Sequence, residues 1–106
     1  RDDDIMNAGG FRVSPLEVEA ALSLHPGIRE VAAIEKQVKT DTTVIAAFYV
    51  GPAPIPQDEL SAFAAERLAR YKCPRIFHHI EALPRSANGK VNRKALREYT
   101  FARRQT

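Results

Sequence analysis

The chain has 106 residues, of which 44% are hydrophobic, and its formal net charge is +3. This length suits one domain, the apolar content argues against intrinsic disorder, and the single Cys73 excludes an internal disulfide framework. No apolar run approaches the roughly 20 residues that a membrane-spanning helix needs, and the first residues lack signal-peptide features. We therefore expect a cytoplasmic protein with no membrane span.

The first third of the chain predicts a hairpin followed by a helix. Residues 5–13 mix apolar side chains around Gly9-Gly10, which is typical of two short strands joined by a turn. In "SPLEVEAALSLHPG", Ser14 is the expected N-cap, Pro15 the first helical residue, and Glu17 the partner in a capping box. The expected apolar face of this helix consists of Leu16, Ala20 and Leu24, with Val18, Ala21 and Leu22 between them.

The rest of the chain alternates strands and helices. "REVAAIEKQV" and "TTVIAAFYV" predict two strands joined in a tight hairpin, and residues 57–71 predict an amphipathic helix that ends before Pro74. "RIFHHIEAL" predicts a third strand, and "VNRKALREY" a short helix capped by Asn92. The expected fold class is α+β: a small domain with a short N-terminal two-stranded hairpin and a mainly three-stranded sheet flanked by helices.

The C-terminal third is strongly basic. Residues 84–106 contain seven lysines and arginines against one acid, Glu98, which suggests an anionic partner, although a solvated charged helix has the same pattern. A small basic nucleic-acid-binding module is one alternative. However, no recognised binding motif is present and the aromatic residues do not alternate with the charges, so we expect no nucleic-acid partner.

The stretch "LPRSANGKVNRKAL", residues 83–96, places a Gly-Lys pair in a polar loop. A phosphate-binding Walker loop needs an earlier glycine and a Ser or Thr after the lysine. Pro84 and Val91 occupy those two positions, so the loop is of another kind. The sequence predicts an exposed, positioned Lys90 whose purpose needs a different explanation.

Three stretches together provide that explanation: "RDDDIMNAGGFRVSPLEVEAAL", "RLARYKCP" and "LPRSANGKVNRKAL". In order and spacing they resemble the C-terminal domain of adenylate-forming enzymes, the superfamily of acyl-CoA synthetases, luciferases and peptide-synthetase adenylation domains. The resemblance covers nearly the whole chain. It implies a hinge remnant at residues 1–4, a C-terminal lid domain at 5–106, and an absent large N-terminal domain without which the isolated lid is inactive.

The resemblance also implies a reaction and a set of roles. Such enzymes activate a carboxylic acid with ATP and Mg²⁺ to an acyl-adenylate, and many then transfer the acyl group to coenzyme A. Lys90 would be the catalytic lysine of the first half-reaction, with Gly89 allowing its loop to approach the nucleotide closely. After domain alternation, Gly9 and Gly10 would line the channel that admits the thiol of coenzyme A.

Further roles follow from the same resemblance. Arg1 corresponds to a basic residue that contacts the nucleotide, and Asp3 to the hinge, with Asp2 and Asp4 as rivals for that position. "YKCPR" is similar to a segment near the nucleotide end of coenzyme A, which makes Lys72 and Arg75 candidate contacts for its phosphates. The Mg²⁺ belongs with ATP in the N-terminal domain, so we expect no metal site in this chain.

The acceptor of the acyl group is the main choice left open. "NGKVNRKAL" resembles the peptide-synthetase motif, in which the acceptor is a carrier protein, whereas "GGFRVSPLEVE" resembles the CoA-ligase form, which we favour. The implied partners are the enzyme's own N-terminal adenylation domain, a carboxylic acid, and a lysine acetyltransferase acting at Lys90, because "PRSANGK" fits the context in which some acyl-CoA synthetases are acetylated.

The cysteine and histidine residues show no pattern typical of a catalytic or metal site. Cys73 has no neighbouring residues with the spacing of a nucleophile's partner or of metal ligands. His78 and His79 are expected on opposite faces of their strand, which prevents joint metal chelation, and His25 is expected at a helix end.

Overall fold

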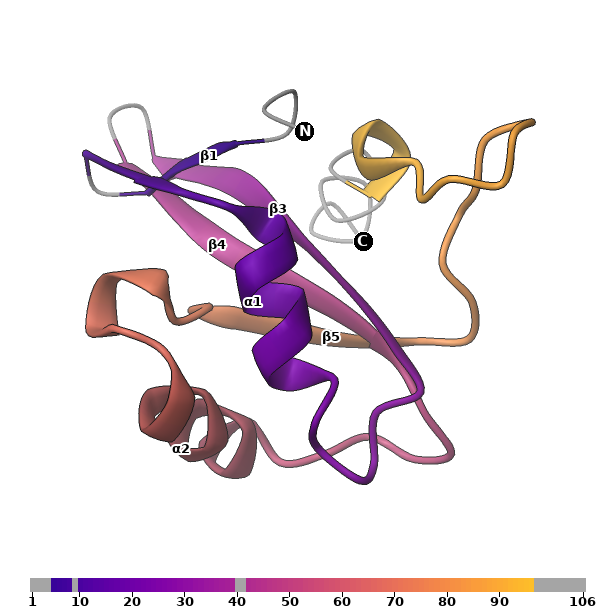
Figure 1. Ribbon diagram of the computed structural model, residues 1–106, viewed down its shortest axis with the longest axis horizontal. Helices are drawn as coiled ribbons and strands as arrows, with labels where there is room; N and C mark the ends of the chain where they lie inside the picture. The colour runs from indigo at the N-terminus through magenta and orange to yellow at the C-terminus, as the bar shows by residue number, and fades with distance from the viewer. Residues whose placement is uncertain (1–4, 9, 40–41, 97–106) are drawn as a thin grey trace.

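The computed structural model describes residues 5–8, 10–39 and 42–96, and it confirms the expected α+β architecture (Figure 1). Its elements, in chain order, are β1 (Met6–Ala8), β2 (Phe11–Val13), α1 (Pro15–Leu22), β3 (Glu30–Lys39), β4 (Thr42–Val50), α2 (Gln57–Arg67), the short 3₁₀ helix η2 (Arg70–Lys72) and β5 (Ile76–Ile80). A further helical turn occupies residues 93–96.

The main sheet has the strand order β3-β4-β5. β3 and β4 form the expected antiparallel hairpin, with Glu30 opposite Val50 at one end and a register irregularity between Gln37 and Lys39 near the other. β5 pairs in parallel with β4 after the chain has crossed over through α2. β4 is therefore the central strand, which explains why its segment from Ile45 to Tyr49 is buried throughout.

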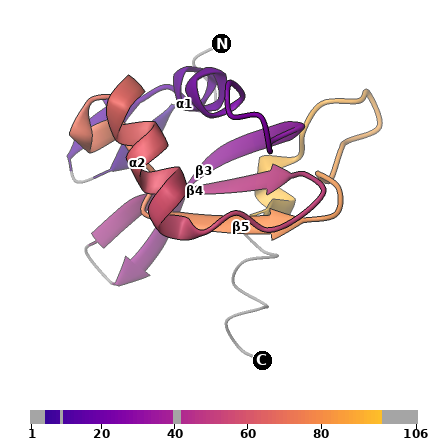
Figure 2. The same ribbon diagram turned by 90° about the horizontal axis from the view of Figure 1, so that it is seen from below.

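Both faces of the sheet carry a hydrophobic core because successive strand residues point to opposite sides. Ala33 and Tyr49 belong to the first core, which includes buried side chains of α1 and α2, and Figure 2 shows both helices over one face of the sheet. Phe48 belongs to the second core, together with Leu83 and with Leu96 from the helical turn at 93–96. The segment that follows Lys90 therefore packs on the face opposite α1.

The N-terminal hairpin is short but firmly attached to the sheet. Met6 pairs with Val13 across the hairpin, and both side chains are only 1% exposed. The backbone N–H of Asn7 donates to Glu35 at 2.9 Å, and the Thr43 hydroxyl donates to the Asn7 carbonyl at 2.7 Å. These contacts fix the turn at Gly10 relative to β3 and β4.

Helix α1 differs from the expectation in two respects. Ser14 occupies the N-cap position in an extended conformation, but its side chain makes no cap hydrogen bond, so the predicted capping box is wrong. Glu17 is instead paired with Lys72. The predicted face is also wrong in part, because Leu16 and Leu24 are 58% and 67% exposed.

The buried face of α1 lies on its other apolar residues. Pro15, Val18 and Leu22 are the buried residues, at i, i+3 and i+7, which is one stripe of a helix. The sequence offers apolar residues on more than one side of this helix, and the tertiary contact with the sheet decides which side is buried.

Two later boundaries also differ. α2 ends at Arg67 instead of continuing to residue 71, because Leu68 turns into an extended conformation while burying its side chain in the first core. Pro74 therefore does not end the helix.

The predicted strand at "RIFHHIEAL" is confirmed as β5, but it is shorter than that stretch. The Asn92 cap is confirmed, since its Oδ1 accepts the N–H of Ala95 at 3.0 Å; the remainder of that predicted helix lies outside the described residues.

Within the part of the chain that the structure describes, no helix has the length and apolar character that crossing a membrane requires.

Two leucines of α1 provide a matched test of its buried face. Leu22 is fully buried and Leu16 is mostly exposed. We expect Leu22→Ala to lower the free energy of unfolding by about 2–5 kcal/mol, and Leu16→Ala to change it by less than about 0.5 kcal/mol. Urea unfolding followed by circular dichroism measures both, and equal losses would contradict the assigned orientation of α1.

Candidate functional site

Lys90 lies at the end of a tight, hydrogen-bonded loop. The N–H of Gly89 donates to the Ser86 carbonyl at 2.9 Å, and the N–H of Ser86 donates to the Lys90 carbonyl at 2.8 Å. This pattern closes a three-residue loop over residues 87–89 in which the last residue adopts a left-handed conformation, and Gly89 has φ of 86°. The loop stands away from the domain body, and Lys90 is exposed (Figure 1).

The two stems of this loop are also paired with each other. Arg85 and Val91 form an antiparallel bridge, and the N–H of Asn92 donates to the Pro84 carbonyl at 2.8 Å. The Arg85 guanidinium adds a brace, because Nη1 donates to the Gly89 carbonyl at 3.0 Å and Nη2 lies 3.2 Å from Glu30 Oε1. The loop is therefore a small hairpin of defined shape.

Arg93 joins this hairpin to the domain body. Its Nη2 lies 2.7 Å from Glu19 Oε2, and its Nε donates to the Ala33 carbonyl at 3.2 Å. The same Glu19 oxygen accepts the N–H of Ala33 at 2.8 Å. Sequence reasoning missed this cluster, because nothing local connects two side chains that are 74 residues apart.

A second group of candidate residues gathers near the turn of the β1–β2 hairpin. Phe11 and Tyr71 stack with ring centroids 4.3 Å apart and an interplanar angle of 26°, although the two residues are 51% and 41% exposed. They line a pocket of about 270 Å³ that also contains the predicted Arg75. Its other lining residues are Thr42, Thr43, Val44, Ile45, Arg70 and Cys73.

This pocket combines a stacked aromatic pair with two arginines, which suits a ligand that carries a planar ring and anionic groups. Of its residues, only Arg75 was a predicted site residue. Phe11, Arg70 and Tyr71 were missed, although Tyr71 is the first residue of the "YKCPR" segment and Arg70 immediately precedes it.

Lys72 has a different environment from Arg75. Its Nζ lies 2.7 Å from Glu17 Oε2, and the side chains are 22% and 47% exposed. The hydrogen bond with Glu17 raises the pKa of Lys72, desolvation opposes the shift, and the charge of Glu17 adds to it. Lys72 therefore forms an ion pair with α1, whereas Arg75 lines the pocket.

The two described candidate glycines are required by backbone conformation. Gly10 has φ of 89° and Gly89 has φ of 86°, and a Cβ at either position would meet nothing within 4 Å. Within the domain, a side chain is therefore disfavoured by torsion and not by crowding. The other predicted site residues, Arg1, Asp3 and Gly9, lie outside the described residues, as do Asp2 and Asp4.

The histidines have structural partners. His78 stacks on Phe48 and His79 packs against Tyr49, at centroid distances of 5.1 and 5.3 Å, so the two imidazoles lie on opposite faces as expected. His25 is buried, and its Nδ1 accepts the N–H of Gly27 at 2.9 Å.

Because Nδ1 of His25 is an acceptor, Nε2 carries the proton and donates to Glu59 Oε2 at 2.7 Å. This residue was expected at a helix end, but α1 ends at Leu22 and the contacts of His25 are with a turn and with α2. Among the described residues, no three His, Cys, Asp or Glu side chains are grouped so that they could hold a metal ion.

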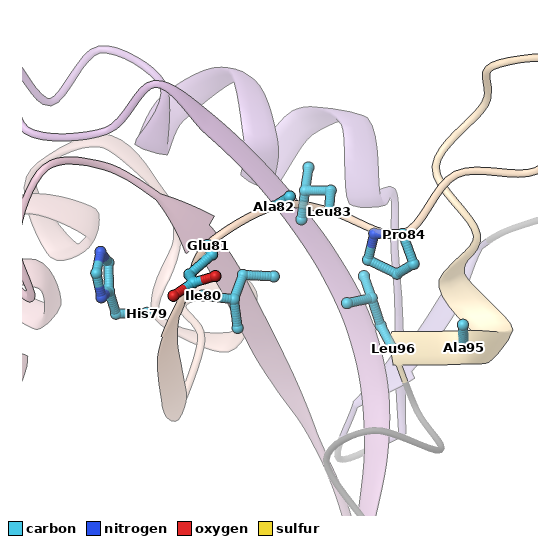
Figure 3. A pocket seen from close by; sticks show the side chains of 8 residues that line it. All are labelled: His79, Ile80, Glu81, Ala82, Leu83, Pro84, Ala95 and Leu96. Atoms are coloured by element: carbon cyan, nitrogen blue, oxygen red, sulfur yellow. The ribbon is translucent and has the colours of Figure 1, made fainter.

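A larger groove lies between the end of β5 and the helical turn at 93–96. Figure 3 shows Leu83, Pro84 and Leu96 beside one another along it, with Glu81 as its one carboxylate. Ile80, Leu83 and Leu96 also belong to the second core. The groove is thus largely the edge of that core, and its lining is mainly apolar, with His79 and Glu81 as its ionisable residues.

Comparison with known proteins shows which family this chain belongs to. The sequence profile of the family "AMP-binding enzyme C-terminal domain" matches residues 17–90. The chain belongs to this family. The matched range begins within α1 and ends at Lys90, so it includes η2, Arg75 and the loop that leads to the lysine, whereas Phe11 of the pocket and the second stem of the hairpin lie outside it.

Curated proteins similar to this AMP-binding C-terminal domain include CoA ligases. The chain is 41% identical over 96 residues to the 2-succinylbenzoate–CoA ligase of Bacillus licheniformis, covering 91% of this chain and 20% of that protein. It is 37% identical over 108 residues to the mitochondrial acyl-coenzyme A synthetase ACSM1 of Mus musculus, covering 95% and 19%. The chain thus spans about a fifth of the length of these curated relatives.

Solved structures show the same fold. The apo structure of MatB from Rhodopseudomonas palustris superposes with a TM-score of 0.86 at 31% identity, covering 93% of this chain and 20% of that one. The o-succinylbenzoate CoA synthetase MenE of Bacillus subtilis, solved with its acyl-adenylate intermediate, has a TM-score of 0.83 at 35% identity, covering 91% and 20%.

The thiol of Cys73 allows a pH test of the pocket beside η2. Burial raises the pKa of this thiol, and its Sγ lies 3.5 Å from the Ala69 carbonyl. Since the thiolate is the reactive form, we expect Cys73 to react with iodoacetamide more slowly than a free cysteine between about pH 7 and 9, with a midpoint shifted to higher pH.

Alkylation rates measured against pH by mass spectrometry check this expectation, with the urea-unfolded chain as the control. A midpoint at or below that of the unfolded chain would show that the positive charges of Arg70 and Arg75 outweigh burial.

Proposed function

We propose that this chain is the mobile C-terminal domain of an AMP-forming acyl-CoA synthetase, and that it works with a large N-terminal adenylation domain. Its membership of the AMP-binding C-terminal domain family and its similarity to CoA ligases support this proposal. They also favour coenzyme A over a carrier protein as acceptor. The observation that carries the proposal is the placement of Lys90 on a braced hairpin that stands away from the body.

In the first half-reaction, a carboxylate oxygen of the acid attacks the α-phosphorus of ATP. The bond between the α-phosphorus and the oxygen that bridges to the β-phosphorus breaks, and pyrophosphate leaves. Negative charge accumulates on the phosphoryl oxygens and the leaving group. We propose that the Lys90 ammonium stabilises this charge in a site from which water is excluded. ATP and its Mg²⁺ would be held by the N-terminal domain, with Arg1 contributing a contact to the nucleotide.

In the second half-reaction, the thiolate of coenzyme A attacks the acyl carbonyl, the bond to the phosphate oxygen breaks, and AMP leaves. We propose that the domain first rotates about a hinge at Asp3 and brings the Gly9-Gly10 turn to the thiol channel. A side chain at Gly10 would then project toward the channel. Arg75, with Arg70 beside it, is the candidate contact for the phosphates of coenzyme A.

The arrangement of the domain supports this division of labour. In both Figure 1 and Figure 2, the β1–β2 turn and the Lys90 hairpin lie at opposite ends of the molecule. A single placement of the domain could not present both of them to one reaction centre. Alternation between two placements, one for each half-reaction, resolves this geometric conflict.

Separate assays of the two half-reactions test the proposal. The variants are made in the complete enzyme that joins this domain to its adenylation domain. We expect Lys90→Ala to slow carboxylate-dependent pyrophosphate exchange roughly 100-fold or more, because the developing charge loses its counter-charge, while coenzyme A still consumes preformed acyl-adenylate. We expect Gly10→Leu to impair mainly the second assay.

A further variant separates bulk from backbone strain at Gly10. Asparagine tolerates a positive φ better than leucine does, so Gly10→Asn adds a side chain with less strain in the hairpin. If it also impairs the second step, the channel explanation is supported. If neither Lys90→Ala nor the Gly10 variants separate the two steps, the assignment of this domain as a two-faced lid is wrong.

Lys90 is also the proposed site of acetylation. Its side chain is exposed at the end of the hairpin, where a modifying enzyme could reach it. Acetylation removes the positive charge but keeps the side chain. We expect enzyme with acetyl-lysine incorporated at position 90 to lose pyrophosphate exchange while it still forms thioester from supplied acyl-adenylate. Equal loss of both activities would contradict this expectation.

A further inference from the structure

Helix α1 carries two glutamates that bind different parts of the domain. Glu17 and Glu19 are two residues apart, which places their side chains about 200° apart around the helix axis. Glu19 binds Arg93, which follows Lys90 in sequence, and Glu17 binds Lys72, which lies between Tyr71 and Arg75. One short helix therefore contacts both of the regions that carry the candidate site residues.

The contact of Glu19 is shielded from solvent and closes the edge of the sheet. Its side chain and that of Arg93 are 15% and 14% exposed. β3 is an edge strand of the main sheet, and the outward-facing N–H and C=O of Ala33 bond to the Glu19 carboxylate and the Arg93 guanidinium. The pair thus reaches around this edge and connects α1 with the helical turn on the opposite face.

This connection fixes the direction of the Lys90 hairpin. Arg93 lies three residues beyond Lys90, and the intervening residues are paired with the other stem through the Arg85–Val91 bridge and the bond from Asn92 to Pro84. A change in the position of Arg93 would therefore be transmitted to the whole hairpin. The second tie, from Arg85 to Glu30, is more exposed at 45% and 47% and holds less firmly.

The contact of Glu17 acts on the other region. Lys72 is the last residue of η2, and its neighbour Tyr71 stacks on Phe11 next to the turn at Gly10. The ion pair of Glu17 and Lys72 is 2.7 Å long, but Glu17 is about half exposed. It holds η2 against α1 more weakly than the Arg93 pair holds the hairpin.

We propose that Glu19 and Glu17 are positioning residues for different half-reactions: Glu19 orients the Lys90 hairpin through Arg93, and Glu17 orients the 70–75 segment through Lys72. α1 then holds the two regions in a constant relation, so that the domain moves as one rigid body. This inference rests on the proposed function, because it assigns one half-reaction to each region.

Two isosteric substitutions on the same helix test it. Glu19→Gln and Glu17→Gln each remove one negative charge and nearly preserve volume. In the complete enzyme, we expect Glu19→Gln to slow pyrophosphate exchange roughly 10- to 100-fold, because a misplaced lysine loses most of its effect, and to spare thioester formation from supplied acyl-adenylate. We expect Glu17→Gln to do the reverse, and only roughly two- to fivefold.

A double-mutant cycle identifies the path of the effect. If Glu19 acts through Arg93, adding Glu19→Gln to Arg93→Gln should slow pyrophosphate exchange by much less than it does alone. Arg93→Lys keeps the charge but cannot donate to Glu19 and the Ala33 carbonyl in the same geometry, so an intermediate loss is expected. If the melting temperature of the Glu19→Gln enzyme shows that it fails to fold, Arg93→Lys tests the same ion pair with a milder change.

The outcomes separate this inference from the proposed function. Equal losses in both half-reactions for each glutamate variant, or a folded Glu19→Gln enzyme with unchanged pyrophosphate exchange, would overturn the positioning roles. If Lys90→Ala separates the two steps while Glu19→Gln does not, only the present inference fails. If Lys90→Ala does not separate them, the proposed function fails first.

Discussion

The ion pair between Arg93 and Glu19 at the edge of β3 is the interaction on which the rest of the arrangement depends. A three-stranded sheet needs helices on both faces to bury its two cores, and here the covering elements lie far apart in sequence. The pair connects them around one edge and also satisfies the backbone of Ala33. Removing Glu19 would leave the Arg93 charge and the N–H of Ala33 without this bond, and removing Arg93 would leave the Glu19 charge and the Ala33 carbonyl without theirs.

The Lys90 hairpin shows how a flexible side chain can be presented by a firm backbone. A lysine has many rotamers, so its useful position depends on where its Cα is held. Gly89 supplies the left-handed residue that closes the loop, and Arg85 bonds to the Gly89 carbonyl. The loop backbone is thus held by bonds within the chain, and the proposed role of Lys90 would require only its side chain to adjust.

The sequence predicted most of the fold because its signals are local. The glycine pair before β2, the β-branched strands and the Asn92 cap each depend on neighbouring residues. The errors arose where distant groups compete with local ones. The Ser14–Glu17 capping box did not form, and Glu17 pairs with Lys72, 55 residues away. Leu16 matched the helical period as well as Leu22 did, and packing against the sheet decided between them.

The candidate site divides in the same way. Lys90, Gly89 and Gly10 could be named as candidates because motifs in the sequence mark them, whereas the stack of Phe11 on Tyr71 and the pair of Arg93 with Glu19 required the tertiary fold.

The closed edge of β3 has a consequence for solubility. Exposed edge strands invite pairing with strands of other molecules, and natural proteins prevent this with charges placed on the edge. At Ala33 both outward-facing backbone groups are already bonded to charged side chains, so an incoming strand would have to displace an ion pair to extend the sheet there. The interaction that joins the two layers of the domain is therefore also a guard against aggregation.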